Sequence, residues 1–168
     1  PNGACTTAAA TVAKIEKLAG SLKGKKVVIL AGTGPIGQIS ALLMRNMGAD
    51  VTITSRSREK AARIASKLSD EVRGKVKGEA GATPSDRCLA CKNAEIILSA
   101  GAIGAQLLDS ETLRKLSPKI VADVNAVQPY GIEDMKPDYD GDLHNGAKML
   151  GSCAIGDLKN KVEKRMLK

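Results

Sequence analysis

The chain has 168 residues, a length that fits one globular domain with a single core. Hydrophobic residues make up 43% and charged residues 26%, a balance that excludes an intrinsically disordered chain. No apolar run approaches the roughly 20 residues of a membrane-spanning helix, so we expect a cytoplasmic protein with no membrane partner. The net charge of +8 suits phosphate-bearing ligands. Because the basic residues are scattered and stacking aromatics are scarce, nucleic acid is not expected.

Strand-like and helix-like segments alternate along the chain, which predicts an α/β fold. With two Tyr and no Phe or Trp, the core must be aliphatic, as in a parallel sheet covered by helices on both faces. We therefore expect a Rossmann-type doubly wound parallel sheet, in three α/β/α layers, with strand order 3-2-1-4-5-6. Strands are expected over residues 25–31, 50–54, 75–79, 95–99, 119–124 and 148–153. Helices are expected over residues 7–19, 35–47, 59–68, 110–115 and 157–167, with one more that starts at residue 84.

Several helices carry signals at their ends or on one face. Thr6 or Thr7 is expected to cap the first helix, and Thr83 to cap the helix that starts at residue 84. The last helix is expected to turn its apolar side chains toward the core. These side chains are Leu158, Val162 and Met166.

Three groups of potential ligand residues do not form a recognisable site. Cys88 and Cys91 form a C-x-x-C inside a predicted helix, and no second pair exists, so plain helix residues are favoured over a zinc or redox motif. His144 is the only histidine and has no evident triad or metal partners. The aspartates of residues 138–142 begin like a calcium loop, but the sixth position is not Gly and the twelfth is not Glu. We expect an acidic loop there and no metal.

A glycine-rich motif joins the first predicted strand to the helix at residues 35–47. It consists of Gly32, Thr33, Gly34, Pro35, Ile36 and Gly37, a G-x-G-x-x-G in the strand-to-helix context that dinucleotide binding requires. Gly32 is expected to permit the tight turn, Gly34 to let the backbone approach a pyrophosphate, and Gly37 to let the helix pack on the strand. The pyrophosphate would lie at the helix N-terminus, where free N–H groups and the helix dipole favour an anion. A mononucleotide P-loop is excluded, since no Gly-Lys-Ser/Thr follows.

The end of the second predicted strand indicates which dinucleotide binds. An NAD site places an acid there to hold the ribose 2′-hydroxyl. Here the strand is followed by Ser55, Arg56, Ser57 and Arg58. A 2′-phosphate would pair with Arg56 and accept hydrogen bonds from the serines, so we expect NADP as the cofactor. Arg58 or Lys60 would share the role if the strand end shifts by a residue or two.

The ends of the fourth and fifth predicted strands are expected to face the nicotinamide, because ligands of doubly wound sheets lie across the carboxyl ends of the strands. The residues expected on this side are Ser99, Ala100, Gly101, Ile103 and Asn125. Small residues leave room for the ring, and Asn125 is a candidate partner of the carboxamide. Asp123 is either a further residue of this site or an ordinary strand-end residue.

Short motifs recur along nearly the whole chain in a fixed order. They read P-N-G at residues 1–3, A-G-T-G-P at 31–35, A-G-A-I-G at 100–104 and V-A-D at 121–123. In this combination the chain resembles the NADP-dependent methylenetetrahydromethanopterin dehydrogenases of one-carbon metabolism. The resemblance implies hydride transfer between NADP and a methylene-bridged tetrahydropterin. Orientation and electrostatics would then outweigh acid–base catalysis, and no catalytic residue is assigned.

Members of that family carry a separate substrate domain ahead of the region that matches Pro1, and nothing here corresponds to it. Residues 1–7 resemble the crossing between the two domains. We therefore interpret residues 1–168 as an NADP-binding Rossmann domain that works as a homo-oligomer or with a partner substrate domain.

Two alternatives stay open at this point. One is a shikimate-dehydrogenase-like NADP-dependent reductase domain, which can share a Ser-Arg-Ser phosphate site. The other is a non-catalytic nucleotide-sensing or nucleic-acid-binding module, which would bind with steep salt dependence and ignore NADP.

Overall fold

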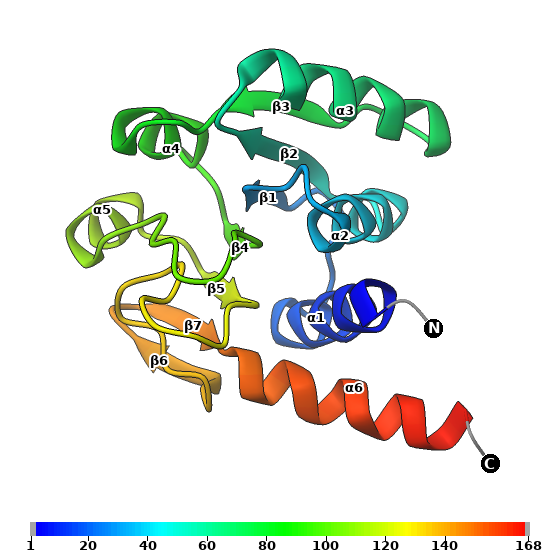
Figure 1. Ribbon diagram of the computed structural model, residues 1–168, viewed down its shortest axis with the longest axis vertical. Helices are drawn as coiled ribbons and strands as arrows, with labels where there is room; N and C mark the ends of the chain where they lie inside the picture. The colour runs from blue at the N-terminus through cyan, green and yellow to red at the C-terminus, as the bar shows by residue number, and fades with distance from the viewer. Residues whose placement is uncertain (1–2, 167–168) are drawn as a thin grey trace.

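The computed structural model describes residues 3–166, which form a seven-stranded sheet with helices on both faces (Figure 1). The sheet order is β3-β2-β1-β4-β5-β7-β6, and neighbouring strands run parallel except for β6 and β7. The strands are β1 (Lys26–Leu30), β2 (Asp50–Ser55), β3 (Lys77–Ala80), β4 (Ile96–Ser99), β5 (Ile120–Asp123), β6 (Asp140–His144) and β7 (Ala147–Leu150). The helices are α1 (Gly3–Ala19), α2 (Pro35–Asn46), α3 (Arg58–Glu71), α4 (Pro84–Ala90), α5 (Ser110–Leu116) and α6 (Ser152–Met166).

The two faces of the sheet carry separate aliphatic cores. Helices α1, α2, α3 and α6 cover one face, and α4 and α5 cover the other (Figure 1). Because side chains alternate along a strand, Ile29 of β1 enters the first core and Val28 enters the second. Ile15 of α1 and Met44 of α2 join the first, and Leu113 of α5 joins the second. The three-layer Rossmann-type fold expected from the sequence is confirmed.

The first helix begins earlier than predicted. It starts at Gly3, so the prediction that Thr6 or Thr7 caps it is wrong. Both threonine hydroxyls instead donate to the carbonyl oxygen of Gly3, at 3.3 and 2.7 Å. Thr6 also donates to Oε1 of Glu163 at 2.9 Å, which ties α1 to α6. The crossing between domains was expected over residues 1–7. Residues 1–2 of this segment lie outside the described part of the chain.

The acidic segment predicted as a loop contains an edge strand. Residues 140–144 form β6, which pairs antiparallel with β7. The two strands are joined by Asn145 and Gly146, both with positive φ (50° and 81°), as in the tight hairpin turns that favour Asn-Gly. The sixth parallel strand is therefore β7, and it ends before the predicted limit because α6 begins at Ser152.

The last helix packs on the body of the domain only through its first part. Leu158 contacts the core as predicted. Val162 is 43% exposed, so the prediction that it faces inward is wrong. The side chain of Met166 and the whole of Leu167 lie outside what the structure describes. Within residues 3–166, no helix combines the length and the apolar character needed to cross a membrane.

The glycine-rich turn brings α2 unusually close to the strand before it. A Cβ placed on Gly37 would lie 2.5 Å from Cα of Gly32 and 2.6 Å from its carbonyl oxygen. A Cβ placed on Gly32 would lie 2.9 Å from the carbonyl oxygen of Ile29. By contrast, no atom lies within 4 Å of a Cβ placed on Gly34. Two of the three motif glycines are thus required by packing, and the third faces open space.

The substitution Gly37→Ala is expected to lower the free energy of unfolding by about 1–3 kcal/mol, because backbone would have to move to admit the methyl group. Gly34→Ala is the matched control and is expected to stay within about 0.5 kcal/mol of the unsubstituted chain. Urea denaturation followed by circular dichroism measures both. Equal midpoints for the two variants would contradict this packing argument.

Candidate functional site

The turn after β1 presents the N-terminus of α2 at the carboxyl edge of the sheet. Gly34 is the N-cap residue, with extended backbone and no side chain to cap the helix, and Pro35 occupies the first turn. The N–H groups of that turn are therefore available to an anion, which the helix dipole also favours. The left-handed residue of the turn is Ala31 (φ 53°) rather than Gly32. Gly32 serves the turn through its lack of a side chain, because a Cβ there would lie 2.9 Å from the carbonyl oxygen of Ile29.

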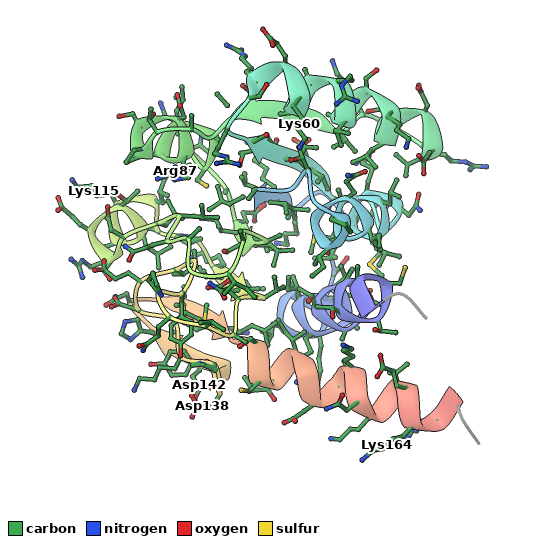
Figure 2. The ribbon with its side chains drawn as sticks, in the orientation of Figure 1. Lys60, Arg87, Lys115, Asp138, Asp142 and Lys164 are labelled. Carbon is green, nitrogen blue, oxygen red and sulfur yellow. The ribbon has the colours of Figure 1, made fainter. Side chains whose placement is uncertain are left out.

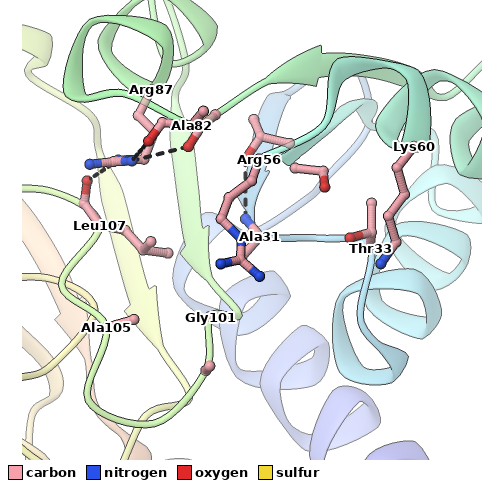
Figure 3. Close-up of a pocket in the computed structure, with 13 residues that line it drawn as sticks. Ala31, Thr33, Arg56, Lys60, Ala82, Arg87, Gly101, Ala105 and Leu107 are labelled. Carbon is pink, nitrogen blue, oxygen red and sulfur yellow. Dashed lines mark hydrogen bonds between the residues drawn. The ribbon is translucent and has the colours of Figure 1, made fainter.

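Beside this turn lies a pocket of about 320 Å³. Its walls come from the turns that follow β1, β2, β3 and β4, so it sits where the strand order reverses on either side of β1. Three cationic side chains line it, Arg56, Lys60 and Arg87, and no Asp or Glu is among its lining residues. Figure 3 shows Arg56 and Lys60 reaching into the pocket from the β2–α3 connection and the first turn of α3. The pocket is therefore suited to an anionic group.

The predicted residues after β2 separate into two groups. Ser55 and Arg56 line the pocket. Ser57 caps α3, with its hydroxyl oxygen accepting the N–H of Lys60 at 3.1 Å. Arg58 is not among the lining residues, and its Nη2 lies 3.7 Å from Oε2 of Glu79 on β3. One of the two expected arginines thus faces the pocket, together with Lys60.

Arg87 was not identified from the sequence. It lies in α4, whose start is fixed by the predicted cap at Thr83 and by a reciprocal capping box with Asp86. Arg87 Nε donates to the carbonyl oxygen of Leu107 at 2.6 Å, and Nη1 donates to those of Gly81 and Ala82, both at 3.0 Å. The guanidinium thereby joins the turn after β3 to the loop after β4, two opposite walls of the pocket (Figure 3).

The residues expected on the nicotinamide side do not share one environment. Gly101 lines the pocket, Ser99 is fully buried, and Ile103 is 74% exposed. Asn125 is buried, and its side chain is used within its own loop. Its Nδ2 donates to the carbonyl oxygen of Pro129 at 3.1 Å, and its Oδ1 accepts the N–H of Val127 at 3.0 Å.

Two side-chain groups set aside in the sequence lie elsewhere in the fold. Cys91 ends α4, and burial raises the pKa of its thiol to about 12, which disfavours the reactive thiolate. His144 Nε2 lies 3.2 Å from Oδ2 of Asp134. His144 ends β6, the strand that also carries Asp142 (Figure 2). Neither Cys91 nor His144 is among the residues that line the pocket.

A doubly wound parallel sheet, a glycine-rich strand-to-helix turn and an adjoining cationic pocket define a nucleotide-binding Rossmann domain. Residues 26–127 match the model of the family described as NADP oxidoreductase, coenzyme F420-dependent. The chain belongs to this family, and the expectation of NADP as the cofactor is confirmed by it.

Two curated relatives come from Methylorubrum extorquens. The chain is 40% identical to the bifunctional protein MdtA over 165 residues. This alignment covers 97% of this chain and 57% of the relative. It is 32% identical to the NAD(P)-dependent methylenetetrahydromethanopterin dehydrogenase over 177 residues. This alignment covers 100% of this chain and 60% of the relative. The resemblance drawn from the sequence motifs is thus confirmed, and the chain spans less than two thirds of the length of either relative.

Solved structures with the same fold are more distant in sequence. A transhydrogenase from Sinorhizobium meliloti superposes with a TM-score of 0.66 at 15% identity, over 99% of this chain and 55% of the other. Shikimate dehydrogenase from Aquifex aeolicus superposes with a TM-score of 0.61 at 18% identity, over 96% and 55%. At this identity the similarity concerns the fold alone.

The substitution Arg87→Met is expected to lower the free energy of unfolding by about 1–3 kcal/mol, because three carbonyl oxygens lose a charged donor. Arg114→Met, on the exposed side of α5, removes the same charge and is expected to change stability by less than about 0.5 kcal/mol. Urea denaturation of both variants measures the difference. If both variants lose the same free energy of unfolding, the effect comes from net charge and not from the hydrogen bonds that Arg87 makes to the three carbonyl oxygens.

Proposed function

We propose that this chain is the NADP-binding domain of a dehydrogenase that transfers hydride between NADP and a methylene-bridged tetrahydropterin. The observation that carries the cofactor part is the pocket after β2, which holds Arg56 and Lys60 and no carboxylate among its lining residues. The pterin part is supported by the name of one of the two relatives, the NAD(P)-dependent methylenetetrahydromethanopterin dehydrogenase. The name of this relative does not include coenzyme F420, which the family description does. The tetrahydropterin, and not coenzyme F420, is therefore proposed as the second substrate.

The pyrophosphate of NADP is assigned to the N-terminus of α2. The motif residues contribute differently: Gly32 and Gly37 hold the helix close to the strand, and Gly34 leaves open space beside the first turn. Thr33 lines the pocket next to them, and its carbonyl oxygen is held by Nε2 of Gln38 at 2.7 Å. Pro35 and Ile36 continue the turn into the helix, where unpaired N–H groups meet the phosphates.

The 2′-phosphate is assigned to Arg56 and Lys60, with the Ser55 hydroxyl nearby. Both cations have their charged ends in the pocket, and a dianionic phosphate monoester gains charge-assisted hydrogen bonds from each. An acid at this place, as in NAD sites, would repel the phosphate. Ser57 is left with a supporting role as the cap of α3, and Arg58, which faces Glu79, is assigned no contact with the phosphate.

The nicotinamide is assigned to the crevice at the ends of β4 and β5, where Ala100 and Gly101 leave room for the ring. Bound NADP supplies a two-electron acceptor that takes hydride from the methylene carbon between two nitrogens of the pterin. Those nitrogens stabilise the resulting cation, so the domain has to orient the reactants and needs no general base. The Asn125 side chain is already hydrogen-bonded to Pro129 and Val127 of its own loop. We therefore propose that it shapes the loop beside the nicotinamide and does not bind the carboxamide.

The substrate domain is proposed to come from outside residues 1–168. This chain spans 57% and 60% of the two relatives, and the cofactor pocket is built from its own turns alone. Binding of NADP is therefore proposed as a property of this chain, and turnover as a property of the assembled enzyme.

NADP is expected to bind at least about tenfold more tightly than NAD, a difference of roughly 1.4 kcal/mol. Arg56→Ala is expected to weaken NADP binding by about 1.5–3 kcal/mol and to leave NAD binding nearly unchanged, because only NADP carries the 2′-phosphate. Isothermal titration calorimetry at one fixed salt concentration measures both ligands.

The matched control for that titration is Arg58→Ala, which removes the same charge two residues away but outside the pocket. It is expected to leave both affinities within about twofold of the unsubstituted chain. Equal losses from the two substitutions would assign the effect to a general positive field. A chain without preference for NADP would overturn the phosphate assignment and leave the fold untouched.

The assembled enzyme is expected to reduce NADP with methylenetetrahydromethanopterin and to leave shikimate unoxidised. The physical reason is that hydride transfer from the aminal carbon needs orientation alone, whereas an alcohol needs a base to remove its proton. Nicotinamide absorbance follows both reactions. Turnover of shikimate in place of the pterin would favour the reductase alternative.

A further inference from the structure

We propose that Asp123, the last residue of β5, is a positioning residue that sets the shape of the nicotinamide end of the crevice by fastening two loops together. These are the β4 loop, residues 100–109, and the β5 loop, residues 124–132. The inference rests on the proposed function, because it concerns how the second half of NADP is held.

The carboxylate of Asp123 is fully buried and binds backbone of its own loop at both ends. One oxygen, Oδ1, accepts the N–H of Asn125 at 3.0 Å. The other, Oδ2, accepts the N–H of Ile132 at 3.1 Å. Asp123 itself has a relative exposure of 0%, and within residues 3–166 it takes part in no ion pair. One side chain thus pins the beginning and the end of the β5 loop.

The far end of the β5 loop is in turn attached to the β4 loop. Ile132 forms a parallel bridge with Leu108. The carbonyl oxygen of Gly131 accepts the N–H groups of both Leu107 and Leu108, at 2.7 and 3.1 Å. Glu133 N–H donates to the carbonyl oxygen of Leu108 at 3.1 Å. Through Ile132, Asp123 therefore fixes the part of the β4 loop that forms a wall of the cofactor pocket.

Close packing leaves this arrangement little freedom. A Cβ placed on Gly131 would lie 2.0 Å from Oγ of Ser99 and 3.1 Å from Oδ1 of Asp123. A Cβ placed on Gly101 would lie 2.9 Å from Cδ1 of Leu107. A shift of the β5 loop is therefore transmitted through Leu107 to Gly101, beside which the nicotinamide is assigned.

A carboxylate suits this position better than an amide. Both of its oxygens accept hydrogen bonds, whereas an asparagine offers one acceptor and turns an NH₂ donor toward the second N–H. Burial raises the pKa of the Asp123 carboxyl, and the N–H groups of Asn125 and Ile132 oppose that rise by stabilising the charge. The buried charge is costly in isolation, and these two N–H groups, together with Ser99 and Gly131, make the residue compatible with the fold.

The test compares two ligands on the Asp123→Asn variant: NADPH, and adenosine 2′,5′-bisphosphate, which lacks the nicotinamide half. We expect the adenosine bisphosphate to keep its Kd within about twofold, because Arg56 and Lys60, to which its 2′-phosphate is assigned, belong to the β2 side of the pocket and, within residues 3–166, form no hydrogen bond or ion pair with the loops that Asp123 fastens. NADPH is expected to bind at least about tenfold more weakly than to the unsubstituted chain. Asp138→Asn, at an exposed position just before β6, is the control and should change neither Kd (Figure 2). Thermal melting accompanies each titration.

Hydrogen exchange of the unsubstituted chain provides a second measurement that does not depend on the folding of a variant. NADPH is expected to slow amide exchange at residues 107–108 and 125–132, and adenosine 2′,5′-bisphosphate to slow it only near the glycine-rich turn and the start of α3. Equal protection by the two ligands would overturn the inference.

Two further outcomes would also overturn it. One is an Asp123→Asn variant that binds both ligands as the unsubstituted chain does. The other is a variant that loses both ligands in equal proportion together with its melting transition, since that describes a residue needed for folding alone. If the unsubstituted chain binds neither ligand, the proposed function itself fails, and that result is distinct from the first two.

Discussion

The close contact between α2 and the turn after β1 is the constraint on which the rest of the site depends. Gly37 rests on the backbone of Gly32, and only residues without a Cβ fit there. The contact forces the chain to reverse sharply, with Ala31 in a left-handed conformation that costs an L-residue about 1–2 kcal/mol. The N–H of Ala31 is held by Oγ1 of Thr54 on β2 at 3.1 Å, which offsets part of that cost. The turn is thus tied to two strands before any ligand binds.

The central strands were predictable because they are buried on both faces and consist of continuous aliphatic runs. The edge was not, since a strand there needs no apolar side chains: residues 140–144 are mostly polar and exposed, and pairing with β7 alone makes them a strand. A local signal was present in Asn145 and Gly146, the pair that favours a two-residue hairpin. The start of α1 was missed because Thr6 and Thr7 bond back to Gly3 inside the helix instead of capping it.

The site was predictable to the extent that it is local in sequence. The glycine turn follows from the motif, and Arg56 follows from the chemistry at the end of β2. Which of the later cations joins it depends on where α3 begins, because Arg58 and Lys60 leave the helix on different sides. Arg87 was beyond sequence reasoning, since its role arises only when the turn after β3 and the distant Leu107 meet in space.

The two outer strands of the sheet bear on whether a strand of another chain can add to it. β3 has four residues and pairs its Lys77 with Asp50 of β2, and β6 has five residues, with an irregular register between Asp140 and Asp142. Short, charged and irregular edges offer a poor template for the backbone of another sheet. Edge-to-edge strand addition, the usual path to cross-β aggregates, is therefore disfavoured at both ends of the sheet.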